Sequence, residues 1–464
     1  MKLHKEIPLM LRIAMPLVLA EVGWMSMSVV DTVMVGRLPH PAVAIGAAAL
    51  SQVLYNTLAF GIGGILLGLE TTIAQSHGAD DYPQANRWLW NGLVLATAIG
   101  LLLMLLYFLA PFGMRRLDTA PEVLAGAIGT LGALSWGTLP LLFYFTLRRY
   151  LQAFNHVRVI AATLVTANLV NLLFDWLLIF PHQWSGTFAG HSFVVVLLGR
   201  GVVGSGISTS LARVYQALFL IAAILYLNRK HGYGLLKTSL RPHWASIQRL
   251  LALGLPSGAT ILVEITIFAI VTNIIATLGA VPLAGHEIAL NCIATVFMVP
   301  LGISAAASIR VGQAIGRGSL PEARAAGWTA IGLTGIVMLF ASLLFVSAPH
   351  LLASAFTPDP AVIAAAVPLL LIAAIFQFCD GMQITAIGAL RGAGNTHSGL
   401  ITHLCSYWLL GLPLGLYLCF HQHLGARGLW LGLCAALVAA GVTLIQLWRR
   451  QLRLIQLQQG AVES

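Results

Sequence analysis

Charged residues are scarce in this sequence. Asp, Glu, Lys and Arg make up 9% of its 464 positions, whereas hydrophobic residues make up 58%. A soluble domain carries about 25% charged residues, because its surface must be solvated by water. Most of the surface of this chain must therefore face something else, and the lipid bilayer is the environment that fits. No long polar stretch is present that could form a separate soluble domain.

The sequence also lacks the motifs of disulfide-rich proteins and of most enzymes. Its five cysteines lie in apolar stretches and form no CxxC pair, so neither a disulfide framework nor a zinc site is expected. It contains no GxxxxGK(S/T), HExxH or GxSxG pattern, which argues against an ATP-driven pump and most intramembrane enzymes. We therefore expect no enzyme activity and no cofactor.

Long apolar runs are what the chain has in abundance. A membrane-spanning helix needs about 20 apolar residues, and its backbone satisfies its own hydrogen bonds within lipid. The runs are too long and too evenly apolar for the alternating strands of a membrane barrel. We predict an all-α membrane protein whose twelve transmembrane helices cover residues 9–34, 43–75, 88–112, 123–147, 158–181, 200–227, 248–278, 284–313, 325–349, 361–390, 398–420 and 427–448.

The distribution of basic residues predicts how these spans are oriented. With the N-terminus in the cytoplasm, 19 of the 25 Lys and Arg residues fall on the cytoplasmic side and 5 on the other, while Arg213 lies within a span. Cytoplasmic loops carry such an excess in membrane proteins. We therefore expect a multi-pass inner (plasma) membrane protein with both termini in the cytoplasm. The net charge of +10 then needs no nucleic acid partner.

The two halves of the sequence resemble each other. Residues Ala74–Ala85 align without gaps on Gly312–Ala323, with Gln, Gly, Pro and Ala coinciding at an offset of 238 positions. Leu151–Phe154 matches Leu390–Ala393 at an offset of 239. Matches at nearly one offset are poorly explained by chance, so we infer an internal repeat.

A third match, at an offset of 240, pairs Pro16 with Pro256 early in the first and seventh spans. Each removes helical hydrogen bonds and is a candidate hinge. Six spans per half is an even number, so the halves are parallel repeats. We predict an N-lobe at residues 1–228, a cytoplasmic basic linker at 229–247 and a C-lobe at 248–464. Two such lobes give alternating access when they rock about a central cleft.

Carboxylates within the first half are the first functional candidates, because a charge at the bilayer centre costs about 2.5 kcal/mol or more. Asp31 and Asp175 lie in the outer part of the first and fifth predicted spans. Asn168, Asn171 and Asp175 follow an i, i+3, i+7 spacing and share a helix face. The group could hold Na⁺ with its oxygens, or a proton shared by two close carboxyls. A helix-packing role for the asparagines is the alternative.

The second half carries its own acids, Glu264 and Asp380, near the middle of the seventh and tenth spans. Gln377, Asp380 and Gln383 recur every three residues and form a polar stripe that cannot face lipid. Such acids could bind Na⁺ or a proton, or could form the anionic wall that a substrate cation needs, with aromatic neighbours for cation–π contact.

Other polar residues in the spans are open to two interpretations. Glu21 lies mid-span and either joins the N-lobe site or pairs with a neighbouring helix. Glu70 and Glu287 lie nearer to span ends, where we expect them to reach headgroup water. His403 either relays protons or packs between helices.

Longer stretches of the sequence carry a family pattern. They are Val30–Gly36, Leu151–Ala153, Asn171–Asp175, Gly254–Pro256 with Glu264, Val299–Gly302, Arg310–Gln313, Phe376–Gln383 and Gly388–Thr396. With these motifs the chain resembles, over nearly its full length, the multidrug and toxic compound extrusion (MATE) family and in particular its NorM-like members.

The resemblance implies twelve helices in two six-helix lobes, and efflux of cationic, amphipathic drugs or dyes driven by Na⁺ or H⁺. Asp31 matches the first-span acid of the family, and Asn171 and Asp175 match its fifth-span polar pair. Glu264 and Asp380 match the C-lobe acids that NorM-like members use for cation coupling. The sequence departs from the family at two positions, with Glu21 where Gln is common and Asp175 where NorM-like members often carry Asn.

We therefore expect a monomeric antiporter that exports small organic cations in exchange for Na⁺ or H⁺. A flippase for a lipid-linked sugar precursor is one alternative, and it predicts a cationic cavity for phosphate. An intramembrane enzyme is the other, and it predicts catalytic residues clustered at one interface.

Overall fold

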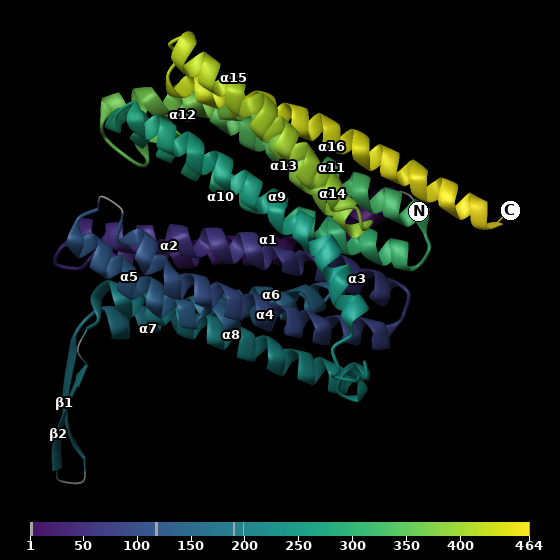
Figure 1. Cartoon of the computed structure of the whole chain (residues 1–464), viewed down its shortest axis with the longest axis horizontal. Helices are drawn as coiled ribbons and strands as arrows, with labels where there is room; N and C mark the ends of the chain where they lie inside the picture. The colour runs from purple at the N-terminus through teal and green to yellow at the C-terminus, as the bar shows by residue number, and fades with distance from the viewer. Residues whose placement is uncertain (1–2, 117–118, 189–190, 198, 464) are drawn as a thin grey trace.

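The computed structural model describes residues 3–116, 119–188, 191–197 and 199–463. Its helices form two groups that lie against each other where the two termini are, at the right of Figure 1, and diverge toward the opposite side. We call the first group the N-lobe and the second the C-lobe. The region of contact near the termini is called the closed end.

The N-lobe contains the helices α1 (Leu3–Val35), α2 (Pro41–Gly63), α3 (Gly68–Gly78), α4 (Tyr82–Met114), α5 (Pro121–Trp136), α6 (Thr138–Ala153), α7 (Val157–Ile179) and α8 (Gly201–His231). A short 3₁₀ segment, η1 (Gly64–Leu67), joins α2 to α3. A second, η2 (Leu235–Lys237), lies in the linker between the lobes.

The C-lobe contains α9 (Trp244–Thr277), α10 (Ala280–Gly316), α11 (Leu320–Ser347), α12 (Pro349–Ser354), α13 (Pro360–Gly392), α14 (His397–His403), α15 (Leu412–Leu416) and α16 (Ala426–Glu463). Two π-helical segments, η3 (Leu404–Gly411) and η4 (Tyr417–His421), complete the span that begins with α14. The linker thus runs from the end of α8 at His231 to Trp244, while lobe boundaries at residues 228 and 248 stay a prediction.

The predicted membrane spans are confirmed. Among the described residues, eleven helices are long and apolar enough to cross a membrane, and the bent pair α5–α6 makes twelve. That pair bends by 46° at Gly137, where a β-carbon would lie 2.7 Å from the Ser210 hydroxyl of α8. The close approach of α8 therefore requires glycine at the bend. The second span is also interrupted, by η1.

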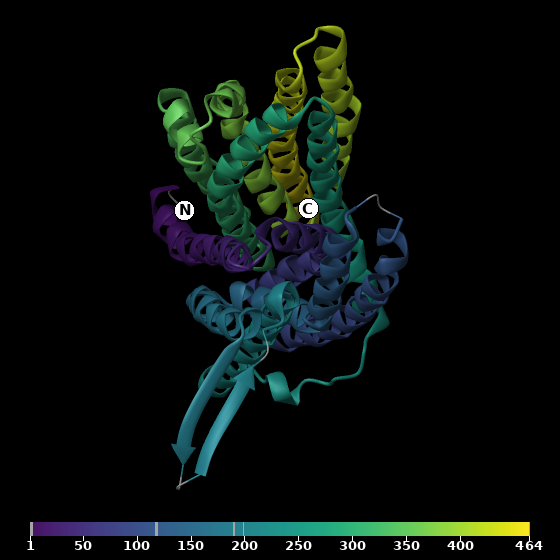
Figure 2. The same cartoon turned by 90° about the vertical axis from the view of Figure 1, so that its left-hand side faces the viewer.

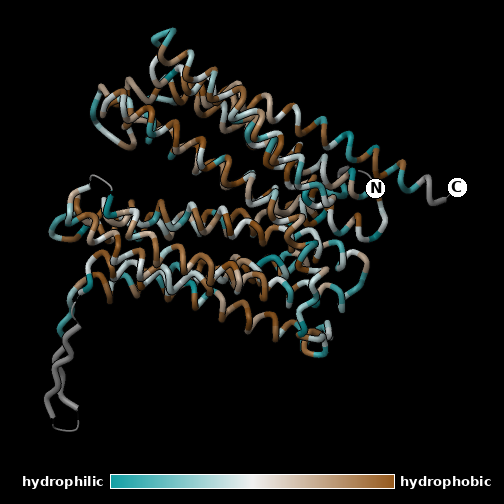
Figure 3. The backbone as a smooth tube through the Cα atoms, viewed as in Figure 1, coloured by the Kyte–Doolittle hydropathy of each residue, from teal (hydrophilic) through white to brown (hydrophobic). Residues whose placement is uncertain are grey.

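Apolar residues follow the helices, whereas hydrophilic residues concentrate in the connecting loops (Figure 3). Helix α4 shows the lipid-facing pattern. Leu101, Leu105 and Phe108 lie on one face and are 59%, 53% and 74% exposed. Side chains spaced by three and four residues line one side of a helix, so this face of α4 lies against lipid.

A β-hairpin interrupts the helical architecture between α7 and α8, in a segment that lies between the fifth and sixth predicted spans. Strands β1 (His182–Phe188) and β2 (His191–Leu197) pair antiparallel, with His182 opposite Leu197. The hairpin extends away from the helices (Figure 2). The run Val194–Leu197 is rich in β-branched residues, which favour strands. A run this short has no periodicity that distinguishes a strand from a helical turn.

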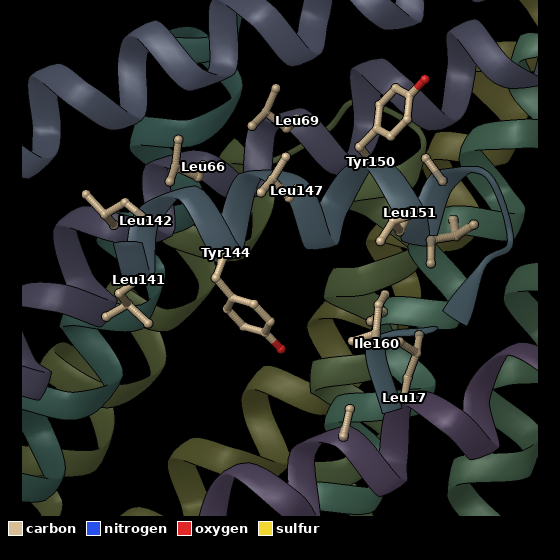
Figure 4. Packing of buried hydrophobic residues seen from close by; sticks show 14 of the residues in the cluster. Leu17, Leu66, Leu69, Leu141, Leu142, Tyr144, Leu147, Tyr150, Leu151 and Ile160 are labelled. Carbon is tan, nitrogen blue, oxygen red and sulfur yellow. The ribbon is translucent and has the colours of Figure 1, made fainter. Parts of the chain in front are cut away.

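The buried core of the N-lobe fixes the position of α6. Leu142, Leu147 and Tyr144 of α6 are buried together with Leu66 and Leu69 of the neighbouring broken span, as Figure 4 shows. Close packing of this kind transmits small displacements rather than absorbing them. The core therefore holds α6, which also carries charged residues, in a defined position within the N-lobe.

Candidate functional site

A cavity of about 200 Å³ lies between the two lobes. Residues of α1, α2 and α6 line it from the N-lobe, and residues of α9, α10 and α13 line it from the C-lobe. A second cavity, of about 410 Å³, shares Phe60 with it and is lined by polar residues such as Gln52 and Asn56 of α2. A ligand in the first, central cavity would therefore contact both lobes at once.

One wall of the central cavity is aromatic. Trp24 of α1 lies 6.0 Å from Phe60 and 6.0 Å from Phe145, between ring centroids, and all three line the cavity. Tyr144 stacks against Trp24 at 6.1 Å from behind. The face of such rings attracts organic cations, so the wall suits a flat cationic or apolar ligand.

Basic residues contribute to the same cavity. Arg148 and Arg149 of α6 and Arg391 of α13 line it, and Arg148 forms an ion pair with Glu21 of α1. Glu21 therefore does both things that its sequence position allowed, since it lines the cavity and pairs with a neighbouring helix. The three arginines make the cavity mixed in charge, whereas the sequence predicted an acidic one.

Glu70 corrects a second expectation. The sequence suggested that it reaches headgroup water, yet it is fully buried. Its carboxylate oxygens lie 3.2 Å from Arg149 of the N-lobe and 3.6 Å from Arg391 of the C-lobe. The second span was predicted to end at residue 75, but α3 continues to Gly78. Glu70 therefore lies inside the helix packing and not at the end of the span. It bridges the two lobes electrostatically.

The C-lobe acids form a cluster that borders the central cavity. Glu264 of α9 lines the cavity and lies close enough to Asp380 of α13 for the two carboxyls to repel each other. Gln383 donates hydrogen bonds to Asp380 Oδ1 at 3.0 Å and to the Tyr407 hydroxyl at 3.1 Å. The predicted neighbour Gln377 is buried without a hydrogen-bond partner among the described residues.

The N-lobe acids form a second cluster, which does not line either of the cavities described above. Asp31 of α1 and Asp175 of α7 are buried and lie within interaction distance of each other. Thr209 of α8 donates a hydrogen bond to Asp31 Oδ2 at 3.0 Å. Asn171 donates to the Ser208 hydroxyl at 3.1 Å. The structure thus brings Asp31, Asn171 and Asp175 together, as their positions predicted.

Four oxygen atoms in this N-lobe cluster have no hydrogen-bond partner among the described residues. They are Asp31 Oδ1, Asn171 Oδ1 and both carboxyl oxygens of Asp175. Buried polar atoms in proteins are almost always paired, and four acceptor oxygens at one place could be paired by a cation or a proton. Nearby, the guanidinium of Arg213 lies 4.4 Å from the centre of the Tyr55 ring.

The other residues predicted for the site lie within helices or make packing contacts between helices. Asn168 donates to the backbone oxygens of Gly23, at 2.9 Å, and Leu164, at 2.8 Å. It therefore joins α7 to α1, which is the helix-packing alternative. Pro16 and Pro256 lie inside α1 and α9, and their role as hinges stays a prediction. The His403 ring packs 5.0 Å from that of Tyr407.

The internal repeat is visible in hydrogen bonds that join the lobes at the closed end. Gln75 of α3 donates to the backbone oxygen of Gly392 at 3.0 Å, and Gln313 of α10 donates to that of Ala153 at 2.8 Å. Gln75 matches Gln313 in the sequence repeat, and Ala153 matches Gly392. The two bonds are therefore equivalent, one from each lobe to the other.

Two glycines allow this contact. A β-carbon on Gly78 would collide with the backbone of Gln313, and one on Gly316 would collide with the backbone of Gln75. Gly78 and Gly316 also match each other in the repeat. Helices α3 and α10 thus cross at a distance that only glycine permits, around an approximate two-fold axis.

The same repeat appears in a comparison with known families. The family model MatE matches the chain twice, over residues 16–177 and residues 256–417. The chain belongs to the MATE family. The two matches fall on the N-lobe and the C-lobe in turn, so each lobe is one copy of the MATE unit.

Relatives and solved structures agree with this assignment. The chain is 34% identical to the "Probable multidrug resistance protein NorM" of Pseudomonas aeruginosa, covering 96% of this chain and 90% of the relative. It is 32% identical to "Multidrug resistance protein MdtK" of Yersinia pseudotuberculosis, covering 94% and 93%. Both relatives are named as multidrug resistance proteins, and this chain is a NorM-like, multi-pass MATE protein.

Solved MATE structures have the same fold. A eukaryotic MATE transporter superposes with a TM-score of 0.85 at 20% identity, over 98% of this chain and 99% of that chain. An outward-facing multidrug resistance MATE family transporter gives 0.85 at 19% identity, over 96% of each chain. A MOP superfamily transporter from Pyrococcus furiosus, described as having a binding pocket of reversed polarity, gives 0.84 at 19%, over 96% of each chain.

Several residues of the site in this MATE protein were not predicted from the sequence. Arg148, Arg149 and Arg391 were assigned to the cytoplasmic ends of spans, but α6 and α13 continue to Ala153 and Gly392 and place them beside the cavity. The three arginines directly follow predicted span ends, and this position was the only indication in the sequence that they belong to the helices that line the cavity. Nothing in the sequence marked the hydroxyls of Thr209 and Tyr407, since such residues are common in helices of every kind.

Proposed function

We propose that this MATE protein is a secondary active transporter that exports small organic cations in exchange for Na⁺ or H⁺. The observation that carries the proposal is the pair of acidic clusters, one in each lobe, in which Asp31, Asp175 and Asp380 are buried and Glu264 lines the cavity between the lobes. Buried carboxylates in a membrane are costly and usually functional. Relatives named as multidrug resistance proteins support the direction and class of transport.

The exchange follows from differential binding. In one state the lobes are closed at one end, and the ion occupies the acids and releases the substrate. The lobes then rock, the ion leaves on the other side, and the emptied carboxylates attract a new substrate cation. The two ligands are coupled because each binds the two states with different affinity.

Glu264 is the residue at which we expect ion and substrate to compete. It faces the central cavity and also belongs to the cluster with Asp380 and Tyr407. A substrate cation on the wall of Trp24 and Phe60 would lie in the same cavity as its carboxylate. An ion held between Glu264 and Asp380 would neutralise that charge and weaken the binding of the substrate.

The N-lobe cluster suits a small ion only. Asp31 and Asp175 are 3% and 0% exposed, so no organic molecule reaches them without a rearrangement of α1, α7 and α8. Four unpaired oxygens match the preference of Na⁺ for hard oxygen ligands. Two facing carboxyls equally suit one shared proton, because the second negative charge is unfavourable. The coupling ion is therefore either Na⁺ or H⁺, bound at Asp31, Asp175, Glu264 or Asp380.

The setting of the transporter is proposed on the same grounds. The excess of basic residues on one side supports an inner-membrane protein with both termini in the cytoplasm. The closed end, where the termini lie, is then the cytoplasmic end, and the structure is an outward-facing state. We propose a monomer that works without a cofactor and without enzyme activity.

A flippase for a lipid-linked anionic precursor is the second candidate. It is favoured by one observation, the three arginines at the central cavity, Arg148, Arg149 and Arg391. Two of them are neutralised by Glu21 and Glu70, and the aromatic wall suits a cation better. We therefore place cation export first.

Transport in vesicles tests the proposal. Purified protein in proteoliposomes is given a Na⁺ gradient and a pH gradient in separate experiments. One of the two gradients should drive ethidium transport. The double variant Asp31→Asn with Glu264→Gln should abolish the response. Glu287→Gln is the matched control, because this half-buried acid of α10 forms no ion pair among the described residues. Transport that ignores both gradients, or that survives in the double variant, would contradict the proposal.

A further inference from the structure

A third cavity lies at the closed end, apart from both acidic clusters. Its volume is about 380 Å³. It is lined by Leu9, Arg12 and Ile13 of α1, by residues 155–159 around the start of α7, and by Arg310 of α10. We call it the basic groove. Because α1 and α7 belong to the N-lobe and α10 to the C-lobe, the groove spans the contact between the lobes.

Two of the three arginines that line the basic groove have no acidic partner in the described part of the chain, so the groove carries a net positive charge. Arg310 is neutralised by Glu6, whose carboxylate accepts hydrogen bonds from its Nε at 2.7 Å and from its Nη2 at 3.0 Å. Arg12 and Arg158 are exposed and have no acidic partner within 4.0 Å among the described residues. Burial, together with the charges of His231, His77 and Lys230, lowers the pKa of His156. The positive charge therefore comes from the two arginines.

The rest of the groove is apolar and continues onto a lipid-facing surface. Leu9, Ile13 and Val157 line it beside the arginines. On α1, Met15 and Leu19 lie one and two turns further into the span and are 63% and 51% exposed. An anionic head group could therefore contact the arginines of the groove while long apolar chains attached to it lie against Met15 and Leu19 of α1.

We propose that the basic groove binds an anionic phospholipid, with its phosphate between Arg12 and Arg158 and its acyl chains along α1. Basic pockets between transmembrane helices on the cytoplasmic side commonly bind anionic head groups. The inference rests on the cytoplasmic orientation proposed above. It goes beyond transport itself, because it assigns a lipid to a site remote from the central cavity.

The position of the groove gives the lipid a conformational role. Arg310 of α10 completes the groove, so the groove requires α10 to lie against α1, as it does at the closed end. A ligand that binds one state of a two-state equilibrium stabilises that state. The lipid therefore favours closure at the cytoplasmic side, alongside the ion pair between Glu6 and Arg310.

Lipid retention by the full-length protein tests the proposal. Delipidated protein in detergent is mixed with phosphatidylglycerol or with phosphatidylcholine, and bound lipid is counted by native mass spectrometry. The wild type should retain phosphatidylglycerol preferentially. The variant Arg12→Gln with Arg158→Gln should bind it about 25-fold more weakly, at about fivefold for each arginine lost near a lipid surface.

The matched control removes the same charge elsewhere. Arg450→Gln with Arg453→Gln lies on an exposed part of α16 and should leave retention unchanged. Equal retention of the two lipids by the wild type, or equal losses in both double variants, would overturn the proposal. Competition by glycerol phosphate as effective as that by the lipid would overturn it as well, because the site would then recognise phosphate alone.

The single variant Arg158→Gln and the absence of transport from the measurement complete the test. If the double variant does not fold, the single variant Arg158→Gln, at an exposed position at the start of α7, should still lose about fivefold. The measurement involves no transport, so a negative result leaves the proposed antiport intact. Conversely, a failure of ion-driven ethidium transport would leave lipid binding unaffected.

Discussion

The two lobes are copies of one unit, yet they hold their acids in different surroundings. In the N-lobe, Asp31 and Asp175 face each other inside the helix packing and reach neither the central cavity nor its neighbour. In the C-lobe, Glu264 lines the central cavity while its partner Asp380 is 5% exposed behind it. Under the proposed function, this difference separates two tasks: the sealed pair would bind only a small ion, whereas the acid at the cavity wall would meet both ion and substrate.

Removing the shared acid should have the largest effect. We expect Glu264→Gln to slow ethidium transport and weaken ethidium binding, because the cavity loses the carboxylate that attracts the cation. A hydrogen bond or contact with a charged group contributes about 1.5–3 kcal/mol, so affinity should fall about 10- to 100-fold. Fluorescence titration and vesicle transport measure the two quantities. Unchanged binding would show that the lobes do not differ in this way.

Removing the sealed acid should separate coupling from binding. We expect Asp31→Asn to abolish gradient-driven transport and leave ethidium affinity near that of the wild type. The asparagine oxygen can still accept the hydrogen bond from Thr209, so the packing is kept while the charge is lost. The same titration and transport assays apply, with Glu287→Gln as the control. A loss of ethidium affinity comparable to that of Glu264→Gln would place the substrate in the N-lobe instead.

The acid behind the cavity wall should give an intermediate result. Asp380→Asn removes a charge next to Glu264 but none from the cavity surface. We expect the dependence of ethidium binding on Na⁺ or on pH to weaken, while binding without the ion changes by about fivefold or less, the equivalent of about 1 kcal/mol. Titrations at several Na⁺ concentrations and pH values measure it. A full loss of binding would mean that Asp380 contacts the substrate directly.

The smallest effects should come from the hydrogen bonds at the closed end. Gln75→Ala removes one bond, to Gly392. Gln313→Ala removes its bond to Ala153 and also a bond to Asn155 Oδ1 at 3.1 Å. Gln75→Ala should therefore destabilise closure by about 1 kcal/mol, and Gln313→Ala should destabilise it more. Distances between spin labels on opposite lobes, in a background whose five cysteines are replaced, report the closed fraction. A shift for Gln75→Ala that equals or exceeds that for Gln313→Ala would contradict this account of the contact.

Much of the fold could be predicted from the sequence, because two physical constraints are strong. Lipid requires long apolar helices, which sets the spans, and the repeat around Gln75 and Gln313 predicts two like halves. That these two segments meet at the closed end is known only from the structure. The hairpin at residues 182–197 could not be predicted, since it lies outside the apolar spans and its short strands have no distinctive period. The bend at Gly137 also depends on a helix, α8, that is distant in sequence.

The candidate site was only partly predictable. The cost of burying charge in lipid pointed to Asp31, Asp175, Glu264 and Asp380, and the structure brings them together in pairs. The same reasoning failed for Glu70, because its partners Arg149 and Arg391 come from other helices. Ion pairs between distant segments are set by packing and leave no periodic trace in the sequence.

Competition between ion and substrate at Glu264 is the central claim, and ethidium binding to the purified protein tests it most directly. Fluorescence titrations are made with Na⁺ varied at constant ionic strength, and separately with pH varied, for the wild type, Asp31→Asn and Glu264→Gln. One of the two ions should weaken ethidium binding in the wild type and in Asp31→Asn, and should have no effect on the residual binding in Glu264→Gln. Ethidium affinity that responds to neither ion in the wild type, or responds equally in Glu264→Gln, would contradict the claim.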